Sequence, residues 1–322
     1  MHALVVGGTG FLGSAIADRL GAAGHTVVVT ARTPPVAPLP AGVTYRHFDA
    51  NTAGDAAYAD VAAGTDLVVH CLGPDDRSAL ADPVDDYLAR ELVDRTVRVA
   101  GAARAAGATR MVVLGSYFTA WERTHPGYAA PHPYIRARLA QHAATVAAGG
   151  EELSVCTVEI PYVFGEQPGR ISQWKPLYDV LRRLPVVACP DGGTTGVARD
   201  TIADAVAAAL DHGTPGASYP VGDDDITWEH WARLGLDELG LRRPFAALPR
   251  AFTAAAGLAL AGVMRLARKP SGLNPTRLAD DIVHNRLFVD HAATRAALGI
   301  GRRDLEADIR ASVRASYPGR AR

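Results

Sequence analysis

Apolar and polar positions follow one another along the chain in two rhythms, one typical of strands and one typical of helices. Short continuous apolar runs predict buried strands at 3–6, 26–30, 43–48, 66–72 and 110–114. Apolar residues at helical spacing predict helices at 14–22, 53–62 and 84–106. This alternation predicts an α/β fold with a doubly wound parallel sheet and right-handed crossovers.

The turn between the first strand and the first helix carries three glycines, Gly7, Gly10 and Gly13, spaced G-x-x-G-x-x-G. Gly7 permits the tight turn, Gly10 lets a phosphate approach the backbone, and Gly13 lets helix and strand pack closely. The helix N-terminus then offers free N–H groups and a positive dipole end to a pyrophosphate. An ordinary glycine-rich turn is the alternative, but the strand–turn–helix context favours a Rossmann-type dinucleotide site.

The end of the second strand decides which dinucleotide such a site prefers. An acidic residue there would bind the ribose 2′-hydroxyl of NAD, whereas an arginine suits the 2′-phosphate of NADP. The chain has no Asp or Glu between residues 27 and 41, and Arg32 lies in this stretch. We predict NADP, with NAD as the alternative; Arg32 would otherwise stack on the adenine or stay in solvent. Asp49, after the third strand, is a candidate adenine contact.

Composition limits the partners that the protein is expected to have. Hydrophobic residues make up 48% of the chain and charged residues 21%, and the net charge of −1 favours neither nucleic acid nor a membrane as a partner. The three cysteines, Cys71, Cys156 and Cys189, lack metal-ligand spacing and are typical of a reducing compartment. No secretory leader precedes the first strand, so we expect a cytoplasmic protein. His125, His132 and His142 also lack metal-ligand spacing, so we expect no metal site.

Two further helices are predicted towards the C-terminus. The apolar stretch 251–263 is interrupted by Thr253 and is too short to span a bilayer, so we interpret it as a core or interface helix. The stretch 305–317 places Leu305, Ile309 and Val313 on one helix face. We expect that face to dock on the core.

Five segments occur in an order that is typical of one enzyme family. They are G-G-T-G-F-L-G at 7–13, D-L-V-V-H-C-L-G at 66–73, R-M-V-V-L-G-S at 110–116, P-Y-I-R-A-R at 133–138 and V-E-I-P-Y-V-F-G at 158–165. Together they resemble the extended short-chain dehydrogenase/reductases, in the NAD-dependent epimerase/dehydratase group. The resemblance implies a dinucleotide-binding domain at 1–165 plus about 196–217, and a smaller substrate-binding region at about 166–195 plus 218–322.

The same resemblance implies which residues hold the cofactor. They come from the glycine turn, from the ends of several strands and from one later helix: Gly7, Thr9, Gly10, Phe11, Leu12, Gly13, Arg32, Asp49, Leu72, Gly73, Tyr134, Arg138, Pro161 and Val163. Members of the family often dimerise through their two long helices, here 84–106 and about 133–149. A homodimer is therefore the expectation.

The family's reaction uses a serine, a tyrosine and a lysine four residues after the tyrosine. The resemblance assigns the first two roles to Ser116 and Tyr134. The lysine position is Arg138, and the first lysine of the chain is Lys175. The charge of Arg138, one helical turn from Tyr134, would favour the ionised phenol, although a guanidinium stays protonated. The family's asparagine in the long helix is also replaced, because residues 90–92 read Arg-Glu-Leu.

Three functions follow from this altered site. The first is an NADP-dependent oxidoreductase that transfers a hydride between a carbonyl and a secondary alcohol of a small or natural-product-type substrate. The second is a non-redox epimerase, dehydratase or cyclase on the same fold. The third is a catalytically degenerate NADP(H)-binding sensor or partner protein.

Substrate contacts are expected from the loop that follows the nucleotide-binding half. Arg170, Trp174 and Lys175 combine cations with an aromatic ring and would suit an anionic or planar substrate, but a solvated loop is the alternative. His132, close to Tyr134 in sequence, is a further candidate acid or base, since histidine titrates near neutral pH.

Overall fold

The computed structural model describes residues 1–74 and 80–318, and a seven-stranded parallel sheet forms its larger part. The sheet order is β10-β6-β5-β4-β1-β2-β3. The strands are β1 (His2–Val6), β2 (Thr26–Ala31), β3 (Val43–His47), β4 (Leu67–His70), β5 (Arg110–Ser116), β6 (Ser154–Ile160) and β10 (Ser218–Pro220). Every neighbouring pair is parallel, so the predicted doubly wound α/β fold is confirmed.

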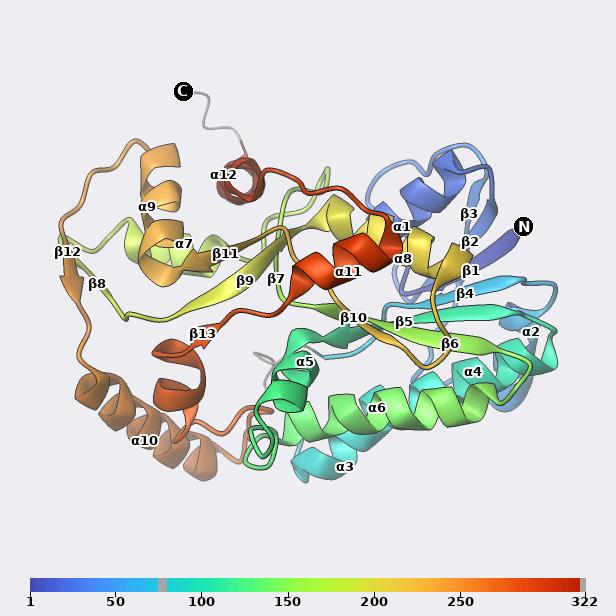
Figure 1. Cartoon of the computed structure of the whole chain (residues 1–322), viewed down its shortest axis with the longest axis horizontal. Coiled ribbons are helices and arrows are strands. Elements are labelled where there is room, and N and C mark those ends of the chain that lie inside the picture. The colour runs from blue at the N-terminus through green and yellow to red at the C-terminus, as the bar shows by residue number, and fades with distance from the viewer. Residues whose placement is uncertain (75–79, 319–322) are drawn as a thin grey trace.

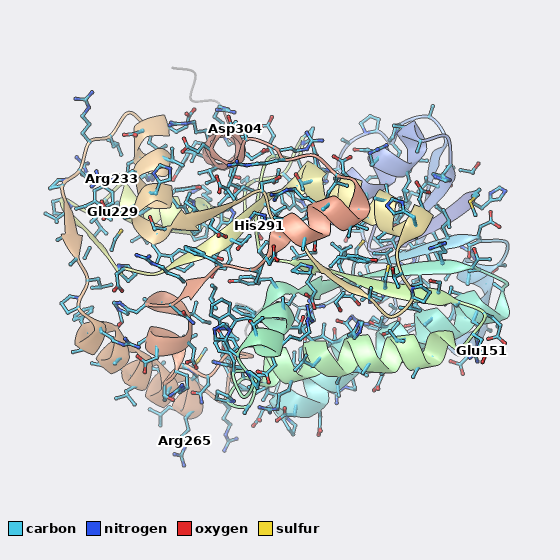
Figure 2. The ribbon with its side chains drawn as sticks, in the orientation of Figure 1. Glu151, Glu229, Arg233, Arg265, His291 and Asp304 are labelled. Atoms are coloured by element: carbon cyan, nitrogen blue, oxygen red, sulfur yellow. The ribbon has the colours of Figure 1, made fainter. Side chains whose placement is uncertain are left out.

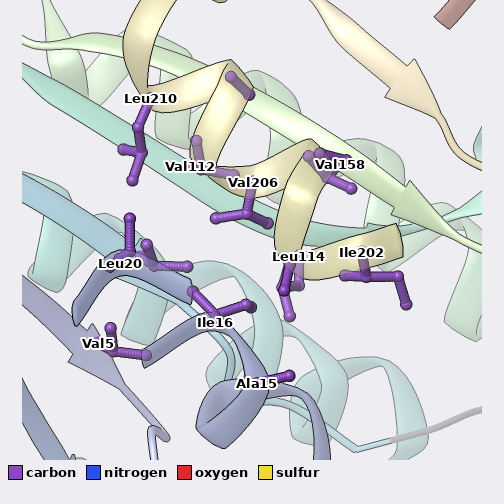
Figure 3. Close-up of a cluster of buried hydrophobic side chains, with 14 of the residues drawn as sticks. Val5, Ala15, Ile16, Leu20, Val112, Leu114, Val158, Ile202, Val206 and Leu210 are labelled. Carbon is purple, nitrogen blue, oxygen red and sulfur yellow. The ribbon is translucent and has the colours of Figure 1, made fainter. Parts of the chain in front are cut away.

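Helices cover both faces of this sheet (Figure 1). Helices α1 (Phe11–Ala22) and α8 (Arg199–His212) share one buried cluster with the first face, and the close-up in Figure 3 shows Ile16, Leu20 and Val206 meeting there. Helices α2 (Asp55–Ala62), α4 (Arg95–Ala105) and α6 (Pro133–Gly149) lie on the other face. Alternate strand residues point to opposite faces, and because helices cover both faces, the residues on both sides of each central strand are apolar.

The predicted helix at 84–106 forms as one helical segment with a change of pitch. It consists of α3 (Val84–Leu88), a π-helical turn η1 (Ala89–Asp94) and α4. π-helical turns inside α-helices are frequent at functional sites. Here the turn places Leu92, which is fully buried, against the backbone of Gly73 at the end of β4.

A second, smaller sheet lies beside the carboxyl ends of the main strands. It contains β7 (Tyr162–Phe164), β9 (Gly193–Ala198), β11 (Asp224–Thr227) and β13 (Arg286–Leu287). Helices α7 (Lys175–Leu181), α9 (Trp228–Glu238) and α12 (Leu305–Ser316) enclose an aromatic core with it, in which the rings of Trp174 and Trp231 lie 4.6 Å apart. As predicted, Leu305, Ile309 and Val313 of α12 are buried. A short ladder pairs β8 (Val187–Cys189) with β12 (Phe245–Ala247), while α5 (Tyr117–Thr124) and α11 (His291–Leu298) pack nearer the main sheet.

The boundaries between the two parts differ in detail from the predicted ones. Strand β9, expected to return to the main sheet, pairs instead with β7, β11 and β13. Strand β10, expected in the substrate-binding region, pairs with β6 at the edge of the main sheet. The predicted division after residue 217 therefore separates the last main strand from α8.

The apolar stretch at 251–263 does not form a core helix, so that half of its interpretation is wrong. It lies in α10 (Arg250–Ala267), where Gly257 is the one buried residue. The helix lies along the outer edge of the molecule and contacts the π-helical turn η2 (Ala279–Val283) (Figure 1). In the described part of the chain it is also the one helix long and apolar enough to cross a membrane.

Candidate functional site

The glycine turn after β1 forms a cradle that a side chain would fill. Gly7 has φ +88°, a region that residues other than glycine rarely adopt, and a Cβ there would lie 2.8 Å from Leu72 Cδ2. A Cβ on Gly13 would overlap the carbonyl of Gly7 and lie 2.7 Å from Gly8 Cα. Helix α1 begins directly after Gly10 without a side-chain cap, so its first N–H groups stay available to a phosphate.

A groove of about 500 Å³ runs from this turn along the ends of β2, β3 and β4. Thr9, Arg32 and Asp49 line it, as the resemblance implies for a cofactor. Arg32 is exposed, and no carboxylate follows β2. Glu91 also lines the groove and forms an ion pair with the buried Arg95 at 2.7 Å, so the guanidinium balances the charge of that carboxylate.

A second cavity of about 270 Å³ continues from the groove, since both are lined by Gly7, Gly10, Leu72 and Gly73. Its lining also contains candidates from four separate segments: Phe11, Leu12, Gly13, Ser116, Tyr134, Arg138, Pro161 and Val163. Every residue that the resemblance assigns to the cofactor therefore lines one of these two connected spaces. The fold brings the candidates together, while their individual roles remain predictions.

Tyr134 and Arg138 are joined by a direct hydrogen bond. Both lie on α6, one turn apart, and the Arg138 Nε–H donates to Tyr134 Oη over 3.0 Å. The guanidinium carbon lies 5.1 Å from the centre of the tyrosine ring. Both side chains are buried, which strengthens a charge-assisted hydrogen bond relative to one in water.

Three further oxygens fix the orientation of Arg138. Its Nη1 donates to Leu114 O over 3.1 Å and to Gln141 Oε1 over 2.9 Å, and Nη2 donates to Pro74 O over 3.4 Å. Gln141 in turn donates to Thr96 Oγ1 over 2.9 Å. The guanidinium is therefore held by β5, α6 and α4 together and keeps Nε directed at the phenol.

Ser116 ends β5 at the wall of the same cavity and is buried. Its hydroxyl has no hydrogen-bond partner among the described residues, so it is available to a ligand. Around it the wall is largely apolar and aromatic, with Tyr117, Phe118, Ile160 and Tyr162. The cavity thus combines a few polar groups with apolar surface, as small-molecule sites commonly do.

The three loop residues that were expected to contact the substrate lie in different places. Arg170 lines the groove that also holds Arg32, together with a smaller neighbouring pocket, and it does not line the Tyr134 cavity. Trp174 lines that cavity but is mostly buried, donating from Nε1 to Val163 O over 2.7 Å. Lys175 pairs with Asp179 and lines neither space. Only Trp174 of the three therefore borders the candidate substrate cavity.

Two histidines near the site are structural. His132 is fully buried, its Nε2 lies 3.0 Å from Asp281 Oδ2, and its Nδ1 accepts from the N–H of Asn274, so the acid–base hypothesis for it is wrong. Burial lowers its pKa. His70, at the end of β4, is also fully buried, and burial with the charges of Arg95 and Arg138 lowers its pKa to about 3. It stays neutral at physiological pH.

Sequence reasoning did not find Gln141 and Thr96, which position Arg138. A signal was present, since Gln141 follows Tyr134 by seven residues and Arg138 by three and so lies on the same helix face. Thr96 could not be assigned in this way, because only the packing of α4 on α6 brings it to Gln141. The aromatic wall after Ser116 was likewise visible only in the fold.

Fold and site together define a class: an α/β protein with a glycine-cradle dinucleotide groove that opens into a serine- and tyrosine-containing cavity. The model of the NAD dependent epimerase/dehydratase family matches residues 3–222, and the chain belongs to that family, whose members are enzymes. A search of curated proteins found no match.

Solved structures share the whole fold. The crystal structure of gox2253 is similar over 99% of both chains, with a TM-score of 0.79 and 19% identity. MoeE5 in complex with UDP-glucose and NAD matches over 98% of both chains, with a TM-score of 0.69 and 18% identity. WbmH of Bordetella bronchiseptica in complex with NAD⁺ matches over 99% of this chain and 98% of its own, with a TM-score of 0.70 and 16% identity. At these identities the similarity concerns the fold.

Proposed function

We propose that the protein is an NADP-dependent oxidoreductase acting on a carbonyl or secondary alcohol of a small, partly apolar substrate. The observation that carries the proposal is the joint position of Ser116, Tyr134 and Arg138 in one cavity that continues into the glycine groove. The aromatic wall beside Ser116 favours substrates with an apolar face.

In this proposal each side chain has a separate task. Ser116 hydrogen-bonds the substrate oxygen, and the Tyr134 hydroxyl gives it a proton in reduction or accepts one in oxidation. Arg138 replaces the family's lysine: its Nε–H donates to the phenol oxygen and stabilises the negative charge that remains when the proton leaves. The bound nicotinamide supplies the hydride.

The preference for NADP rests on the charge at the end of β2. Arg32 lines the groove there, and Arg170 lines the same groove from a loop far along the chain. Two guanidinium groups would bind the 2′-phosphate of NADP through hydrogen bonds and opposite charge, whereas a carboxylate would bind the ribose 2′-hydroxyl of NAD. NAD is the alternative, and the NAD complexes of MoeE5 and WbmH among the similar structures support that alternative for the fold.

A non-redox epimerase or dehydratase is the second candidate, and the description of the matched family favours it. Such an enzyme would use the same cradle and tyrosine, but its product would retain the oxidation state of the substrate. A binding protein without turnover is the third candidate, favoured by the exchange of lysine for Arg138.

Calorimetry with NADPH and NADH on nucleotide-stripped protein tests the cofactor. Tighter binding of NADPH is expected, and binding of neither would overturn the proposal. The activity is then tested by following NADPH oxidation through the absorbance of the reduced nicotinamide over a panel of aldehydes and ketones. Tyr134→Phe serves as the inactive control. Nucleotide-sugar turnover without net NADPH oxidation would favour the epimerase or dehydratase instead.

A further inference from the structure

The outward face of α10 is a continuous apolar surface in contact with solvent. Phe252, Val263 and Leu266 are 66%, 62% and 88% exposed, and the helical period places them on one face. The positions between them on this face are alanines, at 255, 256 and 259, all of them exposed. A soluble helix normally turns its apolar stripe inward, and a larger exposed apolar patch marks an interaction site.

The opposite face of α10 is already occupied by the protein. A Cβ on Gly257 would overlap the backbone of Pro275, and Ala254, Ala261 and Met264 on the same side are half-buried. The helix is also fixed near its start, where Arg250 Nε pairs with Asp280 at 2.6 Å. These contacts hold α10 along the surface, so its exposed face would lie flat on a partner and would not cross a bilayer.

The chain segment that contains α10 carries basic charges and no acidic ones. Residues 239–279 contain seven Lys or Arg and no Asp or Glu, although the whole chain has a net charge of −1. Two of the seven, Arg250 and Arg277, are paired with carboxylates from the turn η2. Arg265, Arg268 and Lys269, at the C-terminal end of α10, form no ion pair among the described residues, and Figure 2 shows Arg265 projecting away from the body of the molecule.

We propose that α10 docks this protein on an anionic lipid surface, with Phe252, Val263 and Leu266 inserted at the headgroup boundary. An apolar face flanked by lysine and arginine is the pattern of an interfacial helix, whose basic groups bind lipid phosphates while their stems cover apolar surface. Charge complementarity favours an anionic lipid surface over a second copy of the chain as the partner of α10. Residues 239–279 contain no carboxylate, and the two that follow directly, Asp280 and Asp281, are already paired with Arg250 and Arg277. Two copies packed through α10 would therefore bring basic residues together without a free carboxylate from this segment to balance them.

The docking face is joined to the candidate cavity by a short segment. Directly after α10, Pro270 O accepts a hydrogen bond from the N–H of Leu80 over 3.2 Å, and Gly272 O accepts one from the N–H of Tyr134 over 2.9 Å. A Cβ on Gly272 would lie 2.8 Å from Tyr134 Cβ, so the two backbones are in close contact. A lipid surface on α10 would therefore lie next to the segment that packs on Tyr134.

The test is co-sedimentation of the full-length protein with vesicles, either of phosphatidylcholine or of an equal mixture of phosphatidylcholine and phosphatidylglycerol. The wild type should pellet with the anionic vesicles and be released by high salt, because screening weakens the headgroup contacts. The double variant Val263→Glu, Leu266→Glu should lower this partitioning by on the order of 100-fold, since two buried apolar side chains are lost.

Matched variants separate docking from general surface effects. Val180 is also an exposed valine on a helix, α7, so Val180→Glu should leave vesicle binding unchanged. Arg265→Glu with Lys269→Glu should weaken binding to anionic vesicles by roughly 25-fold or more. Arg183→Glu, at an exposed arginine beyond α7, should not. Circular dichroism confirms that each variant is folded.

Three results would overturn the proposal. They are a wild type that stays in the supernatant with anionic vesicles, a Val263→Glu, Leu266→Glu variant that pellets like the wild type, and equal binding to neutral and anionic vesicles. A wild-type dimer that the same double variant dissociates, seen by analytical ultracentrifugation, would assign α10 to a second copy. Vesicle binding is independent of cofactor and turnover, so these outcomes do not depend on the proposed activity.

Discussion

The two ends of the candidate site are built by different means. At the glycine turn, backbone geometry forms the site, and every position follows the family's pattern. At the Tyr134 end, side chains form it, and the lysine of the pattern is replaced by Arg138 within a network of four hydrogen bonds. The comparison teaches that cofactor binding and turnover can depend on separate parts of this chain, and the variants below test whether they do.

The largest effect is expected for Tyr134→Phe. Removing the hydroxyl takes away the proton donor and acceptor, so turnover should fall on the order of 10²–10⁴-fold. NADPH affinity should change far less, because the glycine turn is untouched. Steady-state kinetics and calorimetry on the same preparation measure both quantities. A variant with wild-type turnover would remove Tyr134 from the mechanism.

The converse result is expected at the glycine end for Gly13→Ala. The new Cβ would overlap the backbone of Gly7 and Gly8, which must shift and distort the phosphate cradle. NADPH affinity should fall on the order of 100-fold, the scale of one to two lost hydrogen bonds to charged groups. Gly101→Ala on α4 is the matched control, because a Cβ there meets nothing within 4 Å. If Gly13→Ala binds like the wild type, the close approach is not required.

Arg138→Lys tests whether the arginine has its own role. One ammonium group cannot reach Tyr134 Oη, Leu114 O and Gln141 Oε1 from the directions that the guanidinium uses. Turnover should therefore fall by roughly 10- to 100-fold, the equivalent of one to two hydrogen bonds to a charged group. Arg136→Lys, at an exposed position on the same helix, controls for the exchange itself. A gain in turnover would show instead that Arg138 performs the role of the family's lysine less well than a lysine would.

A smaller change is expected for Arg32→Glu, which alters specificity and not turnover. A carboxylate at the end of β2 would repel the 2′-phosphate and accept a hydrogen bond from the ribose of NADH. The ratio of NADPH to NADH affinity should fall by on the order of tenfold or more. Competition calorimetry measures the ratio, and Arg104→Glu on α4 serves as the control. An unchanged ratio would exclude a 2′-phosphate contact for Arg32.

The strand, turn and helix at the glycine end could be predicted from the sequence because their determinants are local. A strand, three glycines and a helix follow one another within residues 3–22, and no distant contact is needed to define the cradle. The replacement of the family's lysine by Arg138 could also be recognised in the sequence. The hydrogen-bond network of Arg138 could not, because packing alone brings Leu114 to Arg138 and Thr96 to Gln141. For α10 the apolar pattern was interpreted as core or interface, because exposure depends on which elements happen to cover a helix.

Buried His70 gives the Tyr134 end a pH dependence of stability, and this is the smallest effect that we predict. Burial and the charges of Arg95 and Arg138 lower its pKa from 6.5 to about 3 in the folded protein. The unfolded chain therefore binds one more proton than the folded chain as the pH falls below 6.5, and stability contributed by the neutral ring at higher pH is progressively lost. Between pH 7.5 and 5.5 the loss should be about 1 kcal/mol.

The variant His70→Leu should lose less stability over the same pH range, because leucine binds no proton. Neither ring nitrogen of His70 has a hydrogen-bond partner among the described residues, so the exchange breaks no described hydrogen bond. Urea unfolding at pH 7.5 and 5.5 gives the two free energies for each protein. The other buried histidines stay in both proteins, so their contribution cancels in the difference. Equal pH dependence in wild type and variant would mean that His70 is protonated in the folded state, or that water solvates its ring.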